Sequence, residues 1–152
     1  MITATMPTAA NPARVIEVAR AWLGTPYHDQ ASVKGVGCDC IGFARGIWRE
    51  IVGEEPTALP PYSRDWGEVG ARETFAEGVR PFLIEIAPAT AVPGALLLFR
   101  MRRDGPAKHC GVFVDGGMLV HALERRGVTI VPYDTAWQRR TAFAFLFPER
   151  NP

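Results

Sequence analysis

The sequence predicts an α+β domain in which N-terminal helices pack on an antiparallel β-sheet. Two features of the chain favour this class. Before residue 54, apolar residues recur at helical spacing, whereas after Pro93 short β-rich segments alternate with turn residues. Helices that precede the strands, rather than alternate with them, are typical of an antiparallel sheet. We expect the 152 residues to form one domain, 1–152, without internal repeats.

Both predicted N-terminal helices begin at recognisable caps. The first is expected to start at Pro12 with Asn11 as its N-cap, because proline is preorganised for the first helical position. The second is expected to run from Cys40, capped by Asp39, until Gly53 ends it. Apolar side chains fall on one face of each helix, namely Val15, Val18, Ala19 and Trp22, then Ile41, Phe43, Ala44, Ile47, Trp48 and Ile51.

The remaining segments are turns, one uncertain helix and the strands of the sheet. GTPY (24–27) predicts a turn, and VKGVG (33–37) predicts a flexible loop before the cysteines. Proline-rich residues 54–67 predict an ordered excursion over the surface, and residues 71–83 predict a third helix. Strands are expected at 95–100, 109–115, 117–123, 127–133 and 141–147.

Composition excludes several classes of protein. Apolar residues make up 47% of the chain and charged residues 22%, as in ordinary globular proteins. A formal charge of +1 with scattered arginines predicts no nucleic-acid partner, and no apolar run is long enough to span a bilayer. The N-terminus lacks a charged region followed by an apolar stretch. We therefore expect no signal peptide, synthesis in the cytoplasm, and three reduced cysteines.

Cys40 is the candidate nucleophile. At the first turn of a helix, unpaired N–H groups and the positive end of the helix dipole stabilise an anion. A thiol placed there has a lowered pKa and more of the reactive thiolate. The same N–H groups can stabilise the oxyanion that forms when a carbonyl is attacked. The alternative is that Cys40 is simply a small buried apolar residue.

His109 and His121 are the candidate base and its orienting partner. If residues 115–117 form a three-residue turn, Val114 pairs with Met118, and the two histidines share one face of the hairpin, roughly 7–8 Å apart by Cα. A two-residue turn would instead send them to opposite faces. In the first register His109 can act as general base and His121 can orient it. Each histidine alone could equally be a hydrogen-bonded residue at a sheet edge.

A zinc site is the competing interpretation of these residues. Cys38, Cys40, His109, Cys110 and His121 provide enough soft ligands for zinc. However, a C-x-C pair is tighter than the usual zinc knuckle, and alternation along a strand points Cys110 away from the face of His109. We therefore expect no metal and no cofactor, with Cys38 as a bystander in the loop before the helix.

Three motifs together resemble the NlpC/P60 family of papain-like cysteine peptidases, which cleave cell-wall peptides. They are GTPY, GCDCIGFARG and HCGVFVDGGMLVHA, in matching order and spacing within residues 14–123. The resemblance implies that Cys40 is the nucleophile, His109 the base and His121 the third, polar member. It also implies that the hydroxyl of Tyr27 helps to line the oxyanion site.

The same resemblance implies a substrate, with two departures from the family pattern. Ile41 stands where many members have serine, and His28 with Asp29 replaces the more usual residues after the tyrosine. We expect His28 and Asp39 to contribute to the oxyanion or substrate site beside Tyr27. The implied reaction is hydrolysis, through a thioester, of the D-γ-glutamyl–diaminopimelate bond in peptidoglycan stem peptides.

DCIGFARGIWRE together with PPYSRDW is similar to a narrower subgroup, encoded among the tail genes of phages and gene transfer agents. This similarity implies phage-like tail or baseplate proteins as partners, and incorporation of the protein into a particle. Two alternatives remain open. One is a structural tail-hub component with little catalysis, and the other is an acyltransferase that uses the same thioester.

Overall fold

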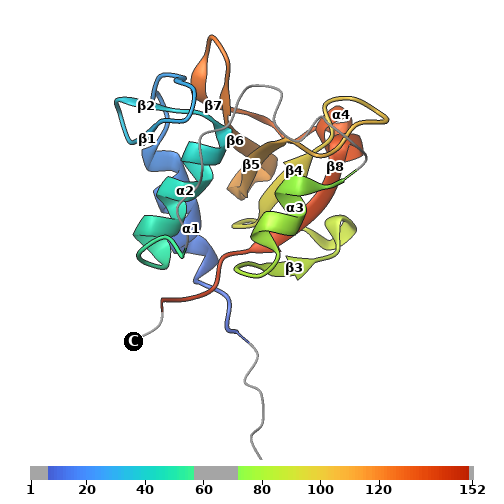
Figure 1. Ribbon diagram of the computed structural model, residues 1–152, viewed down its shortest axis with the longest axis horizontal. Helices are drawn as coiled ribbons and strands as arrows, with labels where there is room; N and C mark the ends of the chain where they lie inside the picture. The colour runs from blue at the N-terminus through green and yellow to red at the C-terminus, as the bar shows by residue number, and fades with distance from the viewer. Residues whose placement is uncertain (1–6, 57–71, 151–152) are drawn as a thin grey trace, which may run out of the picture.

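The computed structural model describes residues 7–56 and 72–150, and a six-stranded antiparallel sheet forms its centre (Figure 1). The order of strands across the sheet is β3-β8-β4-β5-β6-β7. Their bounds are Ile84–Ile86 for β3, Leu96–Phe99 for β4, His109–Val114 for β5, Met118–Leu123 for β6, Gly127–Pro132 for β7 and Thr141–Leu146 for β8. All five neighbouring pairs are antiparallel, so the predicted α+β class is confirmed.

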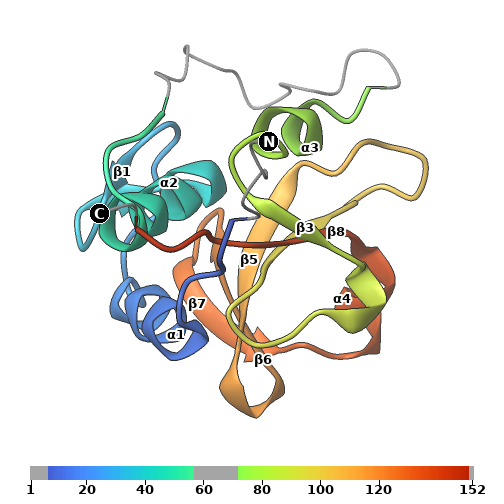
Figure 2. The same ribbon diagram turned by 90° about the horizontal axis from the view of Figure 1, so that it is seen from below.

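The two N-terminal helices pack on one face of this sheet, and both start where the sequence predicts. Helix α1 spans Pro12–Ala21 and helix α2 spans Cys40–Ile51. The Asn11 side chain accepts a hydrogen bond from the Ala13 N–H at 2.9 Å, and Asp39 caps α2 in the same way. Helix α4, Thr135–Arg140, lies on the opposite side of the sheet from α1 and α2 (Figure 2).

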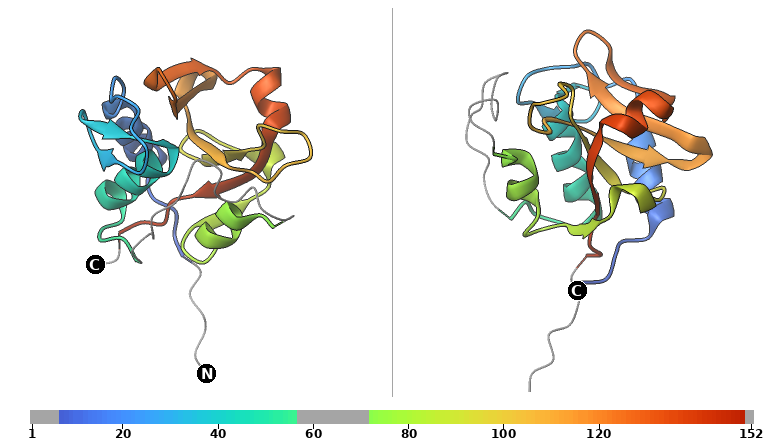
Figure 3. Two further views of the ribbon diagram at one scale, coloured as in Figure 1. Left: turned by 45° about the horizontal axis from the view of Figure 1, so that its top comes forward. Right: turned by 90° about the vertical axis from the view of Figure 1, so that its right-hand side faces the viewer.

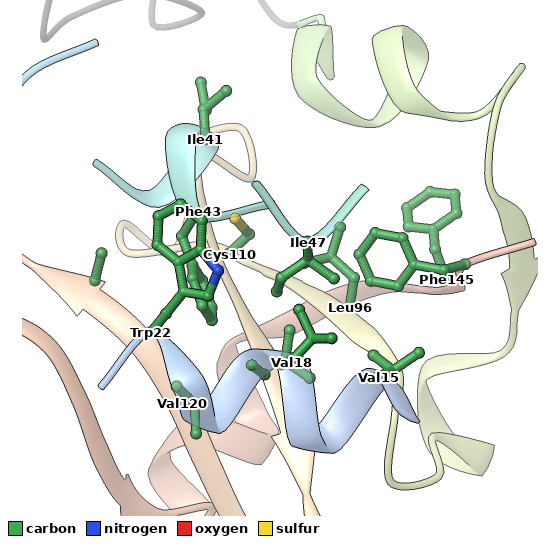
Figure 4. Close-up of a cluster of buried hydrophobic side chains, with 14 of the residues drawn as sticks. Val15, Val18, Trp22, Ile41, Phe43, Ile47, Leu96, Cys110, Val120 and Phe145 are labelled. Atoms are coloured by element: carbon green, nitrogen blue, oxygen red, sulfur yellow. The ribbon is translucent and has the colours of Figure 1, made fainter. Parts of the chain in front are cut away.

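Helices on one face and α4 on the other give the sheet two apolar layers. Toward α1 and α2, the strand residues Leu96 and Val120 pack against Val18 and Ile47 (Figure 4). The same apolar cluster contains Val112. On the other face, a smaller cluster is built from Leu97, Phe99 and Leu119, with Trp137 and neighbouring residues packed against it. Side chains alternate between faces along a strand, and all four residues of β4 are buried because both faces are covered.

Several predicted elements differ in extent. The third helix, predicted over 71–83, is only α3, Thr74–Val79, because Pro81 cannot continue a helix and residues 84–86 pair with β8 instead. The predicted flexible loop 33–37 is part of a hairpin between β1, Ser32–Val33, and β2, Gly37–Cys38. Helix α4 was not predicted. Most of the proline-rich segment 54–67 lies outside the described residues.

The first and last described segments run side by side (Figure 3). The Ala10 N–H donates to the Phe147 carbonyl, and the Glu149 N–H donates to the Thr8 carbonyl, each at 2.8 Å. These bonds tie the entry to α1 to the end of β8. Within the described ranges 7–56 and 72–150, no helix has the length and apolar character needed to cross a membrane.

Candidate active site

The start of α2 places Cys40 against the start of β5. The Cys40 Sγ is partly buried and lies 3.7 Å from the carbonyl oxygen of Lys108, the residue before His109. Asp39 fixes this turn of the helix: its Oδ1 accepts from the Gly42 N–H and its Oδ2 from the Gln30 N–H, both at 2.7 Å. Both oxygens of the Asp39 carboxylate thus accept hydrogen bonds from backbone N–H groups. Its predicted contribution to the oxyanion or substrate site stays a prediction.

The hairpin β5–β6 adopts the register that brings the two histidines together. Residues 115–117 form the turn, and Val114 pairs with Met118. The Nε2 atom of His109 lies 2.9 Å from the Nδ1 atom of His121. The register with a three-residue turn is thus confirmed. Because Nε2 of His109 faces His121, its Nδ1 atom is the nitrogen left for the hydrogen bond with Cys40.

His121 is held neutral in this arrangement. Its side chain is fully buried, and burial, reinforced by the facing charge of His109, lowers its pKa to about 3. A neutral His121 can accept a hydrogen bond at Nδ1 from the Nε2–H group of His109, and it then carries its own hydrogen on Nε2. That Nε2 atom is buried and has no hydrogen-bond partner among the described residues. His121 can therefore orient the His109 imidazole through this hydrogen bond and stay neutral while His109 takes up or gives up a proton.

An aromatic frame of Trp137 and Phe99 surrounds the histidine pair, and no local pattern in the sequence predicted it. The Trp137 ring on α4 lies 4.9 Å from the His121 ring at 88° and 5.9 Å from the His109 ring at 38°, measured between centroids. The Phe99 ring lies 5.8 Å from His109 and 5.0 Å from Trp137. Arg140 extends over the outer side of Trp137, 5.2 Å from the ring centroid. These contacts limit the rotation of both imidazoles.

The three cysteines are free but differ in ionisation. The hydrogen bond with Cys110 and then that with His109, opposed by burial, lower the pKa of Cys40 to about 5. Burial raises the pKa of Cys38 to about 12, and the hydrogen bond with Cys40 together with burial raises that of Cys110. Cys40 is therefore the thiol that is ionised at neutral pH, as expected of a nucleophile.

The GTPY turn lies alongside β2 and brings Tyr27 close enough to Cys40 for the two side chains to interact electrostatically. Tyr27 forms a parallel bridge with Cys38, and the His28 N–H donates to the Cys38 carbonyl at 3.0 Å. Burial, with the facing charges of Cys40 and Asp39, raises the pKa of Tyr27 well above its usual value. Its hydroxyl therefore stays protonated and can donate a hydrogen bond near the thiol.

His28 lies on the exposed rim of this turn. Its Nδ1 atom is 3.2 Å from the Asp29 carbonyl oxygen, and its Cβ packs against Gly37, where an added Cβ would come within 3.0 Å. His28 is thus near Tyr27 in the chain but outside the buried histidine pair. Its predicted contact with substrate stays a prediction.

Glu73 anchors the loop that leads into His109, and it too went unrecognised in the sequence. Its carboxylate accepts from the Ala107 N–H at 2.9 Å and pairs with Arg100. Arg100 also donates to the Gly105 carbonyl at 2.9 Å. Glu73 precedes α3, so these bonds connect that helix to the segment between β4 and β5.

Gly111 makes room for His121. A Cβ built at position 111 would lie 2.9 Å from the His121 Cβ and 2.9 Å from the Val120 carbonyl oxygen. Real Cβ atoms essentially never come that close to such atoms. The glycine in HCG thus permits His121 to approach β5, a signal visible in the sequence only once the register is known.

Two of the residues named as alternative zinc ligands lie on opposite faces of the sheet. Cys110 belongs to the apolar cluster beneath α2, whereas the ring of His109 contacts the aromatic frame on the other face of the sheet. Among the described residues, no three or more histidine, cysteine, aspartate or glutamate side chains are grouped so that they could hold a metal ion.

The part of the chain that contains this site is similar in sequence to known proteins. A sequence model of the NlpC/P60 family matches residues 24–145, a span that contains all the candidate site residues. Gamma-DL-glutamyl hydrolase of Bacillus subtilis (strain 168) is 25% identical over 126 residues, which are 80% of this chain and 27% of that protein. The chain thus corresponds to about a quarter of the length of that relative.

Solved structures share the fold. The NlpC/p60 domain of peptidoglycan hydrolase SagA has a TM-score of 0.58 and 21% identity, covering 89% of this chain and 97% of that one. The peptidoglycan hydrolase RipB of Mycobacterium tuberculosis has a TM-score of 0.57 and 23% identity, covering 91% and 65%. At these identities the likeness concerns the arrangement of the backbone.

Proposed function

The chain belongs to the NlpC/P60 family and has its papain-like fold, and on that premise we propose that it is a cysteine peptidase acting on peptidoglycan stem peptides. The observation that supports this most directly is the alignment of three groups. Cys40 begins α2, His109 is hydrogen-bonded to it, and the neutral His121 lies 2.9 Å from His109. Nucleophile, base and orienting residue are thus in contact in the required order.

The proposed reaction uses each of these groups in two steps. The Cys40 thiolate attacks the carbonyl carbon of the scissile amide, and N–H groups at the start of α2, with the Tyr27 hydroxyl, stabilise the oxyanion. Protonated His109 gives its proton to the amine nitrogen as the C–N bond breaks, which leaves a thioester. Neutral His109 then takes a proton from water, whose oxygen attacks the thioester. The C–S bond breaks, and the acid and the Cys40 thiolate are released.

The proposed scissile bond joins D-γ-glutamate to diaminopimelate. The relative from Bacillus subtilis, named for hydrolysis of gamma-DL-glutamyl bonds, supports a γ-linked acyl side. Such a residue carries a free α-carboxylate, so the pocket must supply donors for it. An ordinary α-linked L-peptide would leave those donors unpaired. Unpaired donors in a binding site lower kcat/KM, so such a peptide should be a much poorer substrate. His28 and the loop from Asp29 to Gly37, which flank Tyr27 and Cys40, are where we expect these determinants.

Mass spectrometry of digests tests the reaction and the substrate together. A disaccharide-tripeptide and casein are incubated separately with the wild-type protein and with Cys40→Ala. We expect the wild type to release diaminopimelate from the first and to leave casein intact, and Cys40→Ala to do neither. Cleavage of casein with intact muropeptide would mean that the substrate is wrong. Equal turnover by Cys40→Ala would mean that the nucleophile is wrong, and no turnover of any muropeptide would favour a structural role.

We further propose that a phage-like tail carries the protein to the wall. The similarity of residues 39–50 and 60–66 to tail-encoded peptidases supports this part of the proposal. Residues 60–66 lie outside the described part of the chain, so the contact surface is left open. Peptide mapping of gradient-purified particles should detect the protein at a fixed ratio to tail proteins. Its absence from particles that are complete and infectious would rule out this route.

A further inference from the structure

Cys110 is a buried thiol that the proposed reaction does not use. It follows His109 on β5, and its side chain points to the opposite face of the strand, into the cluster under α2. Figure 4 shows its sulfur among the side chains there, beside Phe43. Cys110 is 0% exposed, and its Sγ lies 3.1 Å from the backbone carbonyl oxygen of Cys40. The residue thus touches the turn that carries the nucleophile.

A thiol in this place can donate one hydrogen bond to Cys40. The S–H hydrogen rotates about the Cβ–Sγ bond, so it can point to the Cys40 carbonyl oxygen or to the Cys40 Sγ. In the second orientation the Cys110 side chain hydrogen-bonds the Cys40 side chain, a contact that lowers the pKa of Cys40 and raises that of Cys110. The other titratable groups that face Cys40 are Asp39, His109, Tyr27 and Cys38.

We propose that Cys110 is a positioning residue whose S–H donates to the Cys40 thiolate and holds the first turn of α2 against β5. His109 and Cys110 are consecutive, so one strand reaches the same sulfur from both of its faces. His109 exchanges protons with that sulfur during the reaction, whereas Cys110 keeps its proton and stabilises the anion between turnovers. The proposal rests on the proposed function only in taking Cys40 as the nucleophile.

The test measures the thiolate itself and requires no substrate, so its failure is distinguishable from failure of the proposed function. The rate of Cys40 alkylation by iodoacetamide is followed by peptide mass spectrometry from pH 4 to 8 in wild type, Cys110→Ala and Cys110→Ser. A hydrogen bond to a charged group is worth about one factor of ten or more in an ionisation equilibrium. Cys110→Ala should therefore lower the alkylation rate about tenfold below the pH midpoint of the wild type. Cys110→Ser retains a hydrogen-bond donor, so Cys40 in this variant should be alkylated at close to the wild-type rate.

A matched control separates this effect from a loss of packing. Val112 lies two residues along β5 on the same face and is 0% exposed, and it has no polar atom to offer. Val112→Ala should lower the thermal midpoint of unfolding but leave the pH midpoint of Cys40 alkylation unchanged. If Cys110→Ala does not fold, Cys110→Val, which fills the site without a donor, takes its place. An unchanged pH midpoint in the donor-free variant, or an equal shift in Cys110→Ser or Val112→Ala, would overturn the proposal.

Discussion

At the scale of single residues, the ionisation of Cys40 is the property most open to measurement. Its pKa is lowered to about 5, whereas burial raises that of Cys38 to about 12. At pH 7 iodoacetamide should therefore label Cys40 well before Cys38 or Cys110. Because the thiolate is lost as the pH falls through the pKa, the labelling rate should drop between about pH 6 and 4. Peptide mass spectrometry reports each site, and faster labelling of Cys38 would contradict the assignment.

The two histidines should respond differently to substitution. His109→Ala removes the general base that is hydrogen-bonded to Cys40, so we expect a loss of about 10²–10⁴ in kcat. His121→Asn keeps an oxygen that can accept from His109 and should retain a measurable fraction of the activity. Since the pKa of His121 is about 3 and the residue is neutral at the assay pH, His121→Asn should not shift the pH profile between 5 and 8. Full activity in His109→Ala would refute the assigned base.

At the scale of elements, α4 matters because it brings Trp137 over both imidazoles. Trp137→Ala should lower kcat more than it raises KM, because the two imidazoles lose the ring that packs on them, whereas the expected substrate contacts lie on the GTPY turn. The half-buried ring should also contribute about 2–3 kcal/mol of stability, less than a fully buried tryptophan. Trp137→Phe should recover most of kcat. Steady-state kinetics and urea unfolding measure both effects, and a change confined to KM would speak against this role.

The elements that could be predicted from sequence are those set by neighbouring residues. Asn11 and Asp39 each lie beside the N–H groups that they cap, so both helix starts were predictable. The turn at 115–117 fixes the pairing of Val114 with Met118, and with it the histidine pair. Trp137 could not be predicted in the same way. Its contacts join α4 to strands that lie distant in sequence, and no local pattern encodes them.

At the scale of the whole molecule, Glu73 is a second residue whose contacts no local sequence pattern predicts. Its contribution to the free energy of unfolding can be measured. Its bonds with Arg100 and the Ala107 N–H link α3 to the segment before His109, across a part of the chain with no periodic pattern. Glu73→Ala leaves the Ala107 N–H without its acceptor and removes the ion pair of Arg100, which keeps its bond to the Gly105 carbonyl. The substitution should cost about 1–3 kcal/mol in urea unfolding.

The surface pair Arg80–Glu85 provides the control for Glu73. Both of its side chains are about half exposed, 45% and 40%, whereas the Glu73 side chain is 24% exposed. Glu85→Ala should therefore change the free energy of unfolding much less than Glu73→Ala does. Equal effects of the two substitutions would mean that Glu73 is only another surface charge.

The close approach of Gly111 to His121 bears on how inactive copies of such a protein would be recognised in genomes. A survey that scores Cys40, His109 and His121 would count a Gly111→Val copy as an enzyme, since all three residues are intact. Yet any side chain at position 111 must displace the His121 Cβ or the Val120 backbone, and His109 then loses its partner. We expect even Gly111→Ala to fold less stably and to hydrolyse muropeptide much more slowly. Gene decay could thus begin at a residue that carries no reactive atom.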